Sequence, residues 1–138
     1  MARKVLHSGA MPFAERRGKV LVVDEDPLAG EVLSRALSAC GFEVATAADA
    51  AGARAIAAAS PGGIDVVVAD LVLGRGGGIE VAGEVRRTSP AARVLLTSPL
   101  VQDPSDVSHL LEEGMEFVEP SMGPDGLIRA VERATRRS

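Results

Sequence analysis

The sequence predicts an α/β domain with a doubly wound parallel sheet. Short apolar runs alternate with amphipathic helical patterns five times along the chain. The most apolar runs are rich in β-branched residues, which is typical of strands buried on both faces. Successive βαβ units of this kind are right-handed and place helices on both faces of the sheet. A length of 138 residues fits one such domain.

The strands are expected at the five apolar runs. They cover residues 19–23, 42–46, 64–70, 93–97 and 117–118. The runs at 19–23 and 64–70 are nearly continuous in apolar residues, which places them at the centre of the sheet. The run at 42–46 alternates between apolar and polar residues, which is typical of a half-buried strand.

The helices are expected between these runs. They cover residues 27–40, 49–58, 79–88, 103–114 and 124–134. Asp26 before Pro27 is typical of a helix N-cap with proline in the first turn, and Asp103 before Pro104 repeats this signal. The first helix is expected to bury one apolar face, which consists of Leu28, Val32, Leu33, Ala36, Leu37 and Cys40.

Carboxylates follow two of the expected strands. The strand at 19–23 runs into the acidic residues 24–26, and the strand at 64–70 closes with Asp70. The carboxyl ends of parallel strands meet at one edge of the sheet, where open α/β sheets bind their ligands. Clustered carboxylates repel one another unless a cation lies among them, and their oxygen atoms suit Mg²⁺. The sequence therefore predicts a Mg²⁺ site at this edge.

The composition excludes several classes of protein. A net charge of −4 and an aromatic content of 2% argue against direct binding of nucleic acid. The single Cys40 forms no internal disulfide and is expected to be a buried, inert thiol. The sequence has neither an 18-residue apolar run nor the apolar segment of a signal peptide, so we expect no contact with a membrane and a cytoplasmic location.

Three stretches in this order resemble the receiver domain of two-component response regulators. They are residues 20–27, with Asp24-Glu25-Asp26-Pro27; residues 65–73, which include Asp70; and residues 94–98, with Thr97-Ser98. The resemblance covers residues 19–137 and leaves residues 1–18 as a flexible N-terminal tail. It implies a flavodoxin-like (βα)5 fold with the strand order 2-1-3-4-5.

The resemblance also implies chemistry at the acidic edge. Asp70 matches the phosphoacceptor of the family, and a carboxylate is a competent nucleophile. Asp24, Glu25 and Asp70 match the residues that hold Mg²⁺, together with the backbone carbonyl of Val72. Without the resemblance, Asp70 is also explained as an aspartate in the turn after a strand.

Two further positions match the family's switch residues. Thr97 stands where a hydroxyl contacts the phosphoryl group and reorients on activation. Phe117 stands where an aromatic side chain swings inward when the hydroxyl moves. Both have simpler explanations, because threonine is a good strand residue and phenylalanine a common core residue.

One position departs from the family. Glu119 stands where receiver domains carry a lysine that pairs with the phosphoryl group. A shifted alignment does not supply the lysine, because the chain has only Lys4 and Lys19 and both precede the acidic cluster. Arg75, in the glycine-rich loop after Asp70, is the nearest alternative cation.

The resemblance implies a signalling role and no enzymatic activity. The phosphoryl group would come from a histidine kinase or a phosphotransfer protein. The face at 103–137, which holds the fourth helix, fifth strand and fifth helix of the family, would contact a downstream protein or a second copy of the chain. The alternative is a pseudo-receiver, a protein-interaction module that works without phosphorylation, and Glu119 favours it.

Overall fold

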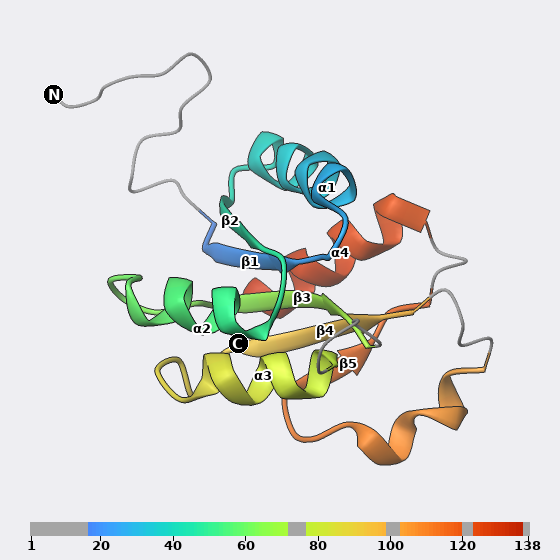
Figure 1. Cartoon of the computed structure of the whole chain (residues 1–138). Helices are drawn as coiled ribbons and strands as arrows, with labels where there is room; N and C mark the ends of the chain where they lie inside the picture. Colours follow the sequence, from blue (N-terminus) through green and yellow to red (C-terminus); the bar gives the residue numbers. More distant parts are fainter. Residues whose placement is uncertain (1–16, 72–76, 99–102, 120–122, 137–138) are drawn as a thin grey trace, which may run out of the picture.

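The computed structural model describes residues 17–71, 77–98, 103–119 and 123–136 (Figure 1). Their five strands are all parallel and form one sheet in the order β2-β1-β3-β4-β5. The strands are β1 (Lys19–Val23), β2 (Glu43–Ala47), β3 (Val66–Asp70), β4 (Arg93–Thr97) and β5 (Met115–Phe117). This order confirms the predicted α/β fold with a doubly wound parallel sheet.

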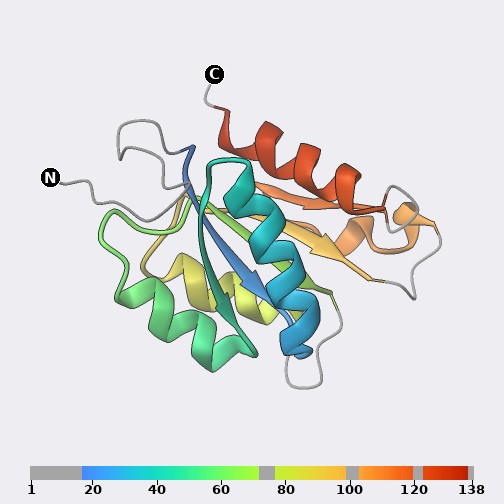
Figure 2. The same cartoon turned by 90° about the horizontal axis from the view of Figure 1, so that it is seen from above.

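Helices cover both faces of the sheet. They are α1 (Pro27–Ala39), α2 (Ala50–Ala58), α3 (Gly78–Arg86) and α4 (Gly123–Thr135). Figures 1 and 2 show α1 and α4 on one face and α2 and α3 on the other. Among the described helices, none is both long enough and apolar enough to cross a membrane.

The central strands divide their side chains between two apolar cores. In β1, Leu21 and Val23 belong to the core beneath α2 and α3, while Val20 and Val22 belong to the core beneath α1 and α4. This alternation follows from the two-residue period of a strand. β3, between β1 and β4, is buried from Val66 to Ala69. The buried residues of β3 fix the end of this strand, and therefore Asp70, at the carboxyl edge of the sheet, where the parallel strands end.

The predicted cap signals begin both helices next to the acidic edge. Asp26 accepts a hydrogen bond from the backbone N–H of Leu28 at 3.0 Å, and Asp49 accepts one from Gly52 at 2.8 Å. α1 then ends before Gly41, whose φ of +98° lies in the left-handed region that glycine tolerates best.

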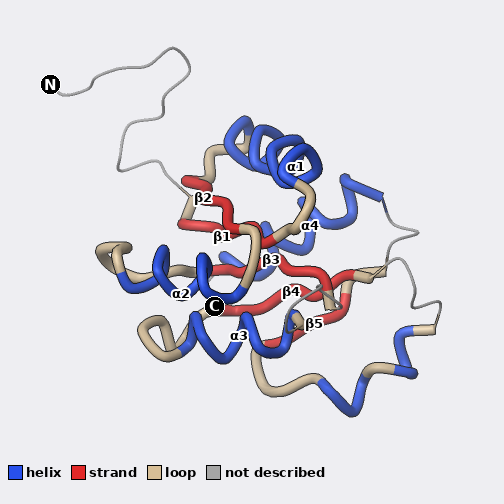
Figure 3. The backbone as a smooth tube through the Cα atoms, in the orientation of Figure 1, coloured by secondary structure: helices blue, strands red, loops and turns tan. Residues whose placement is uncertain are grey.

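The predicted helix at 103–114 is wrong. Two short 3₁₀ turns, Pro104–Asp106 and Ser108–Leu110, replace it between β4 and β5 (Figure 3). Asp103 accepts a hydrogen bond from the backbone N–H of Ser105 at 3.0 Å, and the Ser108 hydroxyl donates to the Ser105 carbonyl at 3.1 Å. Short polar side chains bind nearby backbone in this way and compete with a regular α-helix.

Two of the residues predicted to face inward from α1 are exposed instead. Leu37 is fully buried, and Leu33 and Cys40 are half-buried, but Leu28 is 69% exposed and Val32 is 62% exposed. The expected fully buried thiol of Cys40 is therefore only half-buried. α1 packs on the sheet through the side that carries Leu33 and Leu37, so the apolar stripe is wider than the surface that covers it.

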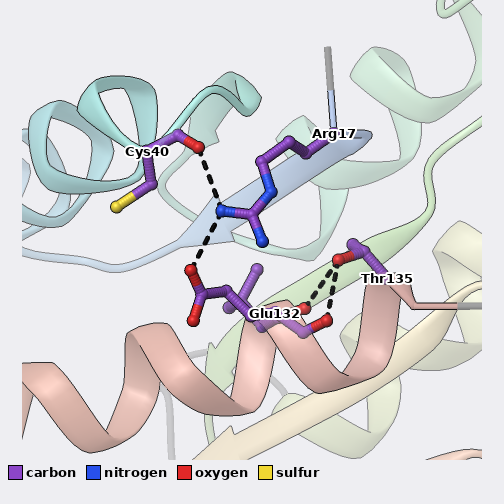
Figure 4. Close-up of polar contacts among 5 residues, drawn as sticks. Arg17, Cys40, Glu132 and Thr135 are labelled. Atoms are coloured by element: carbon purple, nitrogen blue, oxygen red, sulfur yellow. Dashed lines mark hydrogen bonds and ion pairs between the residues drawn. The ribbon is translucent and has the colours of Figure 1, made fainter. Parts of the chain in front are cut away.

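Arg17, which the sequence assigns to the tail, is held against the domain (Figure 4). Its guanidinium donates to Glu132 at 2.9 Å and to the Cys40 carbonyl at 3.2 Å. The guanidinium carbon lies 5.0 Å from the centre of the Phe42 ring. The backbone N–H of Arg17 donates to the Gly41 carbonyl at 3.1 Å. Arg17 therefore links the end of α1 to α4.

Candidate functional site

Two carboxylate residues lie at neighbouring strand ends on the carboxyl edge of the sheet. β1 and β3 pair in parallel with Val23 opposite Ala69, so the next residues along the two chains are Asp24 and Asp70. Both are half-buried, whereas Glu25 is exposed. The sheet register therefore brings Asp24 and Asp70 to neighbouring strand ends, as the sequence predicts.

Local hydrogen bonds position Asp24. Its Oδ1 accepts the backbone N–H of Asp26 at 2.8 Å, and its own backbone N–H donates to the Ala47 carbonyl at 2.9 Å. The Asp26 carboxylate caps α1, which confirms its predicted role. Two acidic residues two positions apart thus have different environments: Asp26 caps the helix, and Asp24 directly follows the last residue of β1.

Thr97 lies beside Asp70. These residues are opposite each other in the register of β3 and β4, and Thr97 is half-buried. The backbone N–H of Leu71 donates to the Thr97 carbonyl at 2.6 Å, which holds the two strand ends together. A residue that carries a hydroxyl is thereby placed opposite the residue that the sequence marks as the acceptor.

The other predicted switch positions lie on and after β5. Phe117 is opposite Leu96 in the sheet and packs, half-buried, against the core beneath α2 and α3. Val118 is buried and donates its backbone N–H to the Leu96 carbonyl at 2.8 Å. Glu119 follows and is exposed. β5 therefore ends next to β4, with Glu119 beyond its last paired residue.

The predicted metal ligands are only partly brought together. Across the described ranges, no three Asp, Glu, His or Cys side chains are grouped so that they could hold a metal ion. Asp24 and Asp70 present carboxylate oxygen atoms at adjacent strand ends, and Mg²⁺ often takes one or two carboxylates and keeps several waters. This donor set fits Mg²⁺. Val72 and Arg75 lie outside the described residues.

Gly78, the last glycine of the glycine-rich stretch after Asp70, also shapes the site. A Cβ atom on Gly78 would collide with the Leu96 side chain and would lie 2.9 Å from the Asp70 carbonyl oxygen. The Gly78 N–H donates to the Leu71 carbonyl at 3.1 Å. The start of α3 thus packs directly on the backbone of Asp70, and the run of glycines after Asp70 was the available signal.

This fold and edge define a class of protein. A five-stranded doubly wound sheet with carboxylates and a hydroxyl at its carboxyl edge is the arrangement expected of a signalling domain of the receiver type. The response regulator receiver domain family matches residues 20–132, and the chain belongs to this family. The domain is a module of two-component signalling and not an enzyme, as predicted.

Curated relatives contain the same domain. The chain is 32% identical over 119 residues to the probable transcriptional regulatory protein TcrX of Mycobacterium tuberculosis, covering 86% of this chain and 50% of that protein. It is 34% identical over 120 residues to the transcriptional regulatory protein KdpE of the same species, covering 86% of this chain and 51% of KdpE. The chain therefore spans about half the length of these relatives.

Solved structures share the fold. A two-component response regulator of the LuxR family from Aurantimonas sp. SI85-9A1 superposes with a TM-score of 0.72 at 30% identity, covering 86% of this chain and 84% of that one. The response regulator TrrA of Thermotoga maritima, solved in complex with Mg(2+)-BeF, gives a TM-score of 0.69 at 29% identity, covering 85% of this chain and 98% of that one.

Proposed function

We propose that residues 19–137 form a receiver domain that accepts a phosphoryl group on Asp70. The observation that carries this proposal is the pairing of Asp70 with Thr97 across β3 and β4, with Asp24 at the next strand end. A carboxylate oxygen of Asp70 attacks the phosphorus atom, and the bond to the donor's histidine nitrogen or acyl oxygen breaks. The leaving group takes the electron pair of that bond.

Mg²⁺ belongs to this proposal as the cation of the site. Asp24 and Asp70 would hold it through carboxylate oxygens, and Glu25 and the Val72 carbonyl are the further predicted ligands. When bound, Mg²⁺ supplies positive charge against the phosphoryl oxygens, which is the main requirement of phosphoryl transfer. The similarity to TrrA, whose structure contains Mg(2+)-BeF, supports this assignment.

The partners proposed here follow from the family. The donor is a histidine kinase or a phosphotransfer protein in the cytoplasm. The output passes through Thr97 and Phe117 to the face at 103–137, where a downstream protein or a second copy of the chain binds. The half-buried position of Phe117 beside β4 supports a coupling between the acceptor edge and this face.

Intact-mass spectrometry after incubation with Mg²⁺ and acetyl phosphate tests the proposal. We expect one added phosphoryl group on the wild-type protein and none on Asp70→Asn. Asp49→Asn is the matched control, because it also neutralises a carboxylate but asparagine caps a helix as well as aspartate does. A phosphoryl group on Asp70→Asn would show that the acceptor is a different residue.

A second candidate function is a pseudo-receiver that binds a partner without phosphorylation. Glu119 favours it, because an anion stands where the family has its lysine. If neither acetyl phosphate nor a phosphorylated kinase adds mass to the wild-type protein, and calorimetry detects no binding of Mg²⁺, this second function replaces the first.

A further inference from the structure

A polar pocket lies at the amino edge of the sheet, where the parallel strands begin, opposite the edge that carries Asp70. It has a volume of about 740 Å³ and is formed by the end of α3, the turn that enters β4 and the residues just before β5. Pockets that bind small molecules have volumes of about 300–1,000 Å³. The pocket therefore has the size of a ligand site, and its described lining contains none of the residues proposed for phosphoryl transfer.

Arg86, which lines this pocket from the end of α3, is held in place by two hydrogen bonds. Its Nε and Nη2 donate to the Ala92 carbonyl at 3.0 and 2.8 Å, and the residue is half-buried. These bonds use one edge of the guanidinium and leave its other N–H donors for a further acceptor. Arg86 is therefore a cation whose position is fixed before any ligand arrives.

Gly114 makes room for this guanidinium. Its φ of +80° lies in the left-handed region, and a Cβ atom at this position would lie 2.6 Å from Nη2 of Arg86. The same Cβ atom would lie 4.0 Å from Cδ of Arg93, the exposed first residue of β4. Two arginines therefore approach the pocket beside Gly114, and guanidinium groups form strong, charge-assisted hydrogen bonds with a carboxylate.

Two carboxylates line the same pocket. Glu112 and Glu113 directly precede Gly114, and both are exposed. The ion pairs found within the described part of the chain join other residues, so these glutamates do not pair with Arg86 or Arg93. The pocket thus combines two cations and two anions that do not neutralise each other in direct contact. A ligand with one charge of each sign complements this lining better than a simple anion or a simple cation.

We propose that this pocket binds a short peptide through its two free ends. The terminal carboxylate bonds to Arg86 and Arg93, and the terminal ammonium group faces Glu112 and Glu113. A free amino acid carries the same two charges, but only one carbon atom separates the groups that bear them. The charged side chains come from three elements around a pocket of about 740 Å³ and are not in contact, so a longer molecule fits their separation.

Peptide binding at this edge does not depend on the proposed phosphoryl transfer. The pocket opens at the start of β4 and β5, whereas Asp70 and Thr97 end their strands at the opposite edge. The binding is therefore tested on the full chain without Mg²⁺ and without a phosphodonor. A failure of peptide binding would leave the proposed function as it stands, and a failure of phosphorylation would leave the peptide site as it stands.

A titration followed by ¹H–¹⁵N NMR tests the proposal, with dialanine and trialanine as probes. We expect saturable shifts of the amide signals of Ala92 and Gly114, which lie in the pocket lining, with either peptide. N-acetylation removes the ammonium charge and C-terminal amidation removes the carboxylate charge, so each blocked peptide should bind at least about tenfold more weakly than the free one. Alanine itself should also bind more weakly.

Variants of the pocket assign each end of the peptide. Arg93→Gln should reduce the preference for the free carboxylate, and the double variant Glu112→Gln/Glu113→Gln should reduce the preference for the free ammonium group. Arg87→Gln is the matched control, because Arg87 is exposed in the described chain and does not line the pocket.

Several results would overturn the proposal. They are an absence of saturable shifts, equal binding of free and blocked peptides, and equal weakening by Arg93→Gln and Arg87→Gln. Acetate that displaces the peptide and binds as tightly would also overturn it, because the pocket would then be a simple anion site.

Discussion

Asp70 and Thr97 occupy opposite positions at the ends of β3 and β4. The hydrogen bond from the Leu71 N–H to the Thr97 carbonyl, 2.6 Å long, continues the pairing beyond the last residue of β3. The backbone therefore fixes the relative position of the two residues, and neither of them lies on a loop. Side chains held on rigid elements are positioned more accurately than those on loops.

Removing the Thr97 hydroxyl should slow transfer to Asp70. A hydrogen bond to a charged group contributes about 1.5–3 kcal/mol, so Thr97→Ala should lower the initial rate of phosphorylation about 10- to 100-fold. Thr97→Ser keeps the hydroxyl and should stay within a few-fold of the wild type. The rate is measured as the gain of intact mass with acetyl phosphate. Equal rates for Thr97→Ala and the wild type would show that the hydroxyl does not contact the phosphoryl group.

The close contact at Gly78 should make this position intolerant of any side chain. Gly78→Ala places a methyl group against Leu96 and the Asp70 carbonyl, so we expect a loss of about 1–3 kcal/mol in the free energy of unfolding and slower transfer. Gly83→Ala, in the same helix with open space around it, should instead stabilise the protein by about 0.5–1 kcal/mol. Urea unfolding measures both. Similar values for the two variants would contradict the contact.

The Arg17 contacts should stabilise the domain measurably. Its ion pair with Glu132 is partly exposed and contributes little by itself, but the guanidinium also bonds the Cys40 carbonyl and covers the Phe42 ring. We expect Arg17→Ala to lower the free energy of unfolding by about 1–2 kcal/mol.

Arg35→Ala is the matched control for Arg17→Ala. In the described part of the chain Arg35 pairs with Glu31, one helical turn away, and both side chains are more than half exposed. Arg35→Ala should therefore lower the free energy of unfolding by no more than about 0.5 kcal/mol in the same urea experiment. If Arg17→Ala lowers the free energy of unfolding no more than Arg35→Ala does, the link between α1 and α4 does not stabilise the fold.

The turn after β4 should be sensitive to acid. The hydrogen bond from the Ser105 backbone N–H, with a smaller contribution from the Ser105 side chain, lowers the pKa of Asp103 below its ordinary value of 3.8. A lowered pKa means that the charged carboxylate stabilises the turn above the unfolded-state value and that this contribution is lost as the pH falls through the folded-state value. A carboxyl-detected NMR titration should place the midpoint of Asp103 below that of an unstructured aspartate, and Ser105→Pro, which removes the backbone donor, should raise it.

The sequence identifies the sheet well because its signals are local and strong. The apolar runs define β1, β3 and β4, and the acidic residues that follow β1 and end β3 can be assigned to one edge from the parallel topology alone. The pairing of Asp70 with Thr97 could not be derived in this way. It depends on which strands are neighbours and on their register, and only the resemblance to a known family supplied that order.

The helices show where local patterns are insufficient. Asp103 before Pro104 is the same signal as Asp26 before Pro27, yet only the latter begins an α-helix. After Asp103, the Ser108 hydroxyl donates to the Ser105 carbonyl, a backbone acceptor that a regular α-helix would use for its own ladder. The stripe that contains Leu28 has helical periodicity, but periodicity does not reveal how much of a stripe another element covers. The exposure of Leu28 and Val32 could therefore be recognised only in the folded chain.

A lysine at position 119 should restore the positive charge that the proposed phosphoryl transfer to Asp70 lacks. Glu119→Lys changes the local charge by two units, and a unit charge about 4 Å away contributes roughly 1 kcal/mol in water and roughly 4 kcal/mol near a protein surface. We therefore expect Glu119→Lys to raise the rate of phosphorylation by acetyl phosphate at least about fivefold.

Glu112→Lys makes the same change in net charge before β5, at the opposite edge of the sheet, and should leave the rate unchanged. An equal increase in both variants would mean that net charge attracts the donor and that position 119 has no special relation to Asp70. No change in either would mean that the side chain at position 119 points away from the phosphoryl group, so that the missing lysine is not what limits transfer.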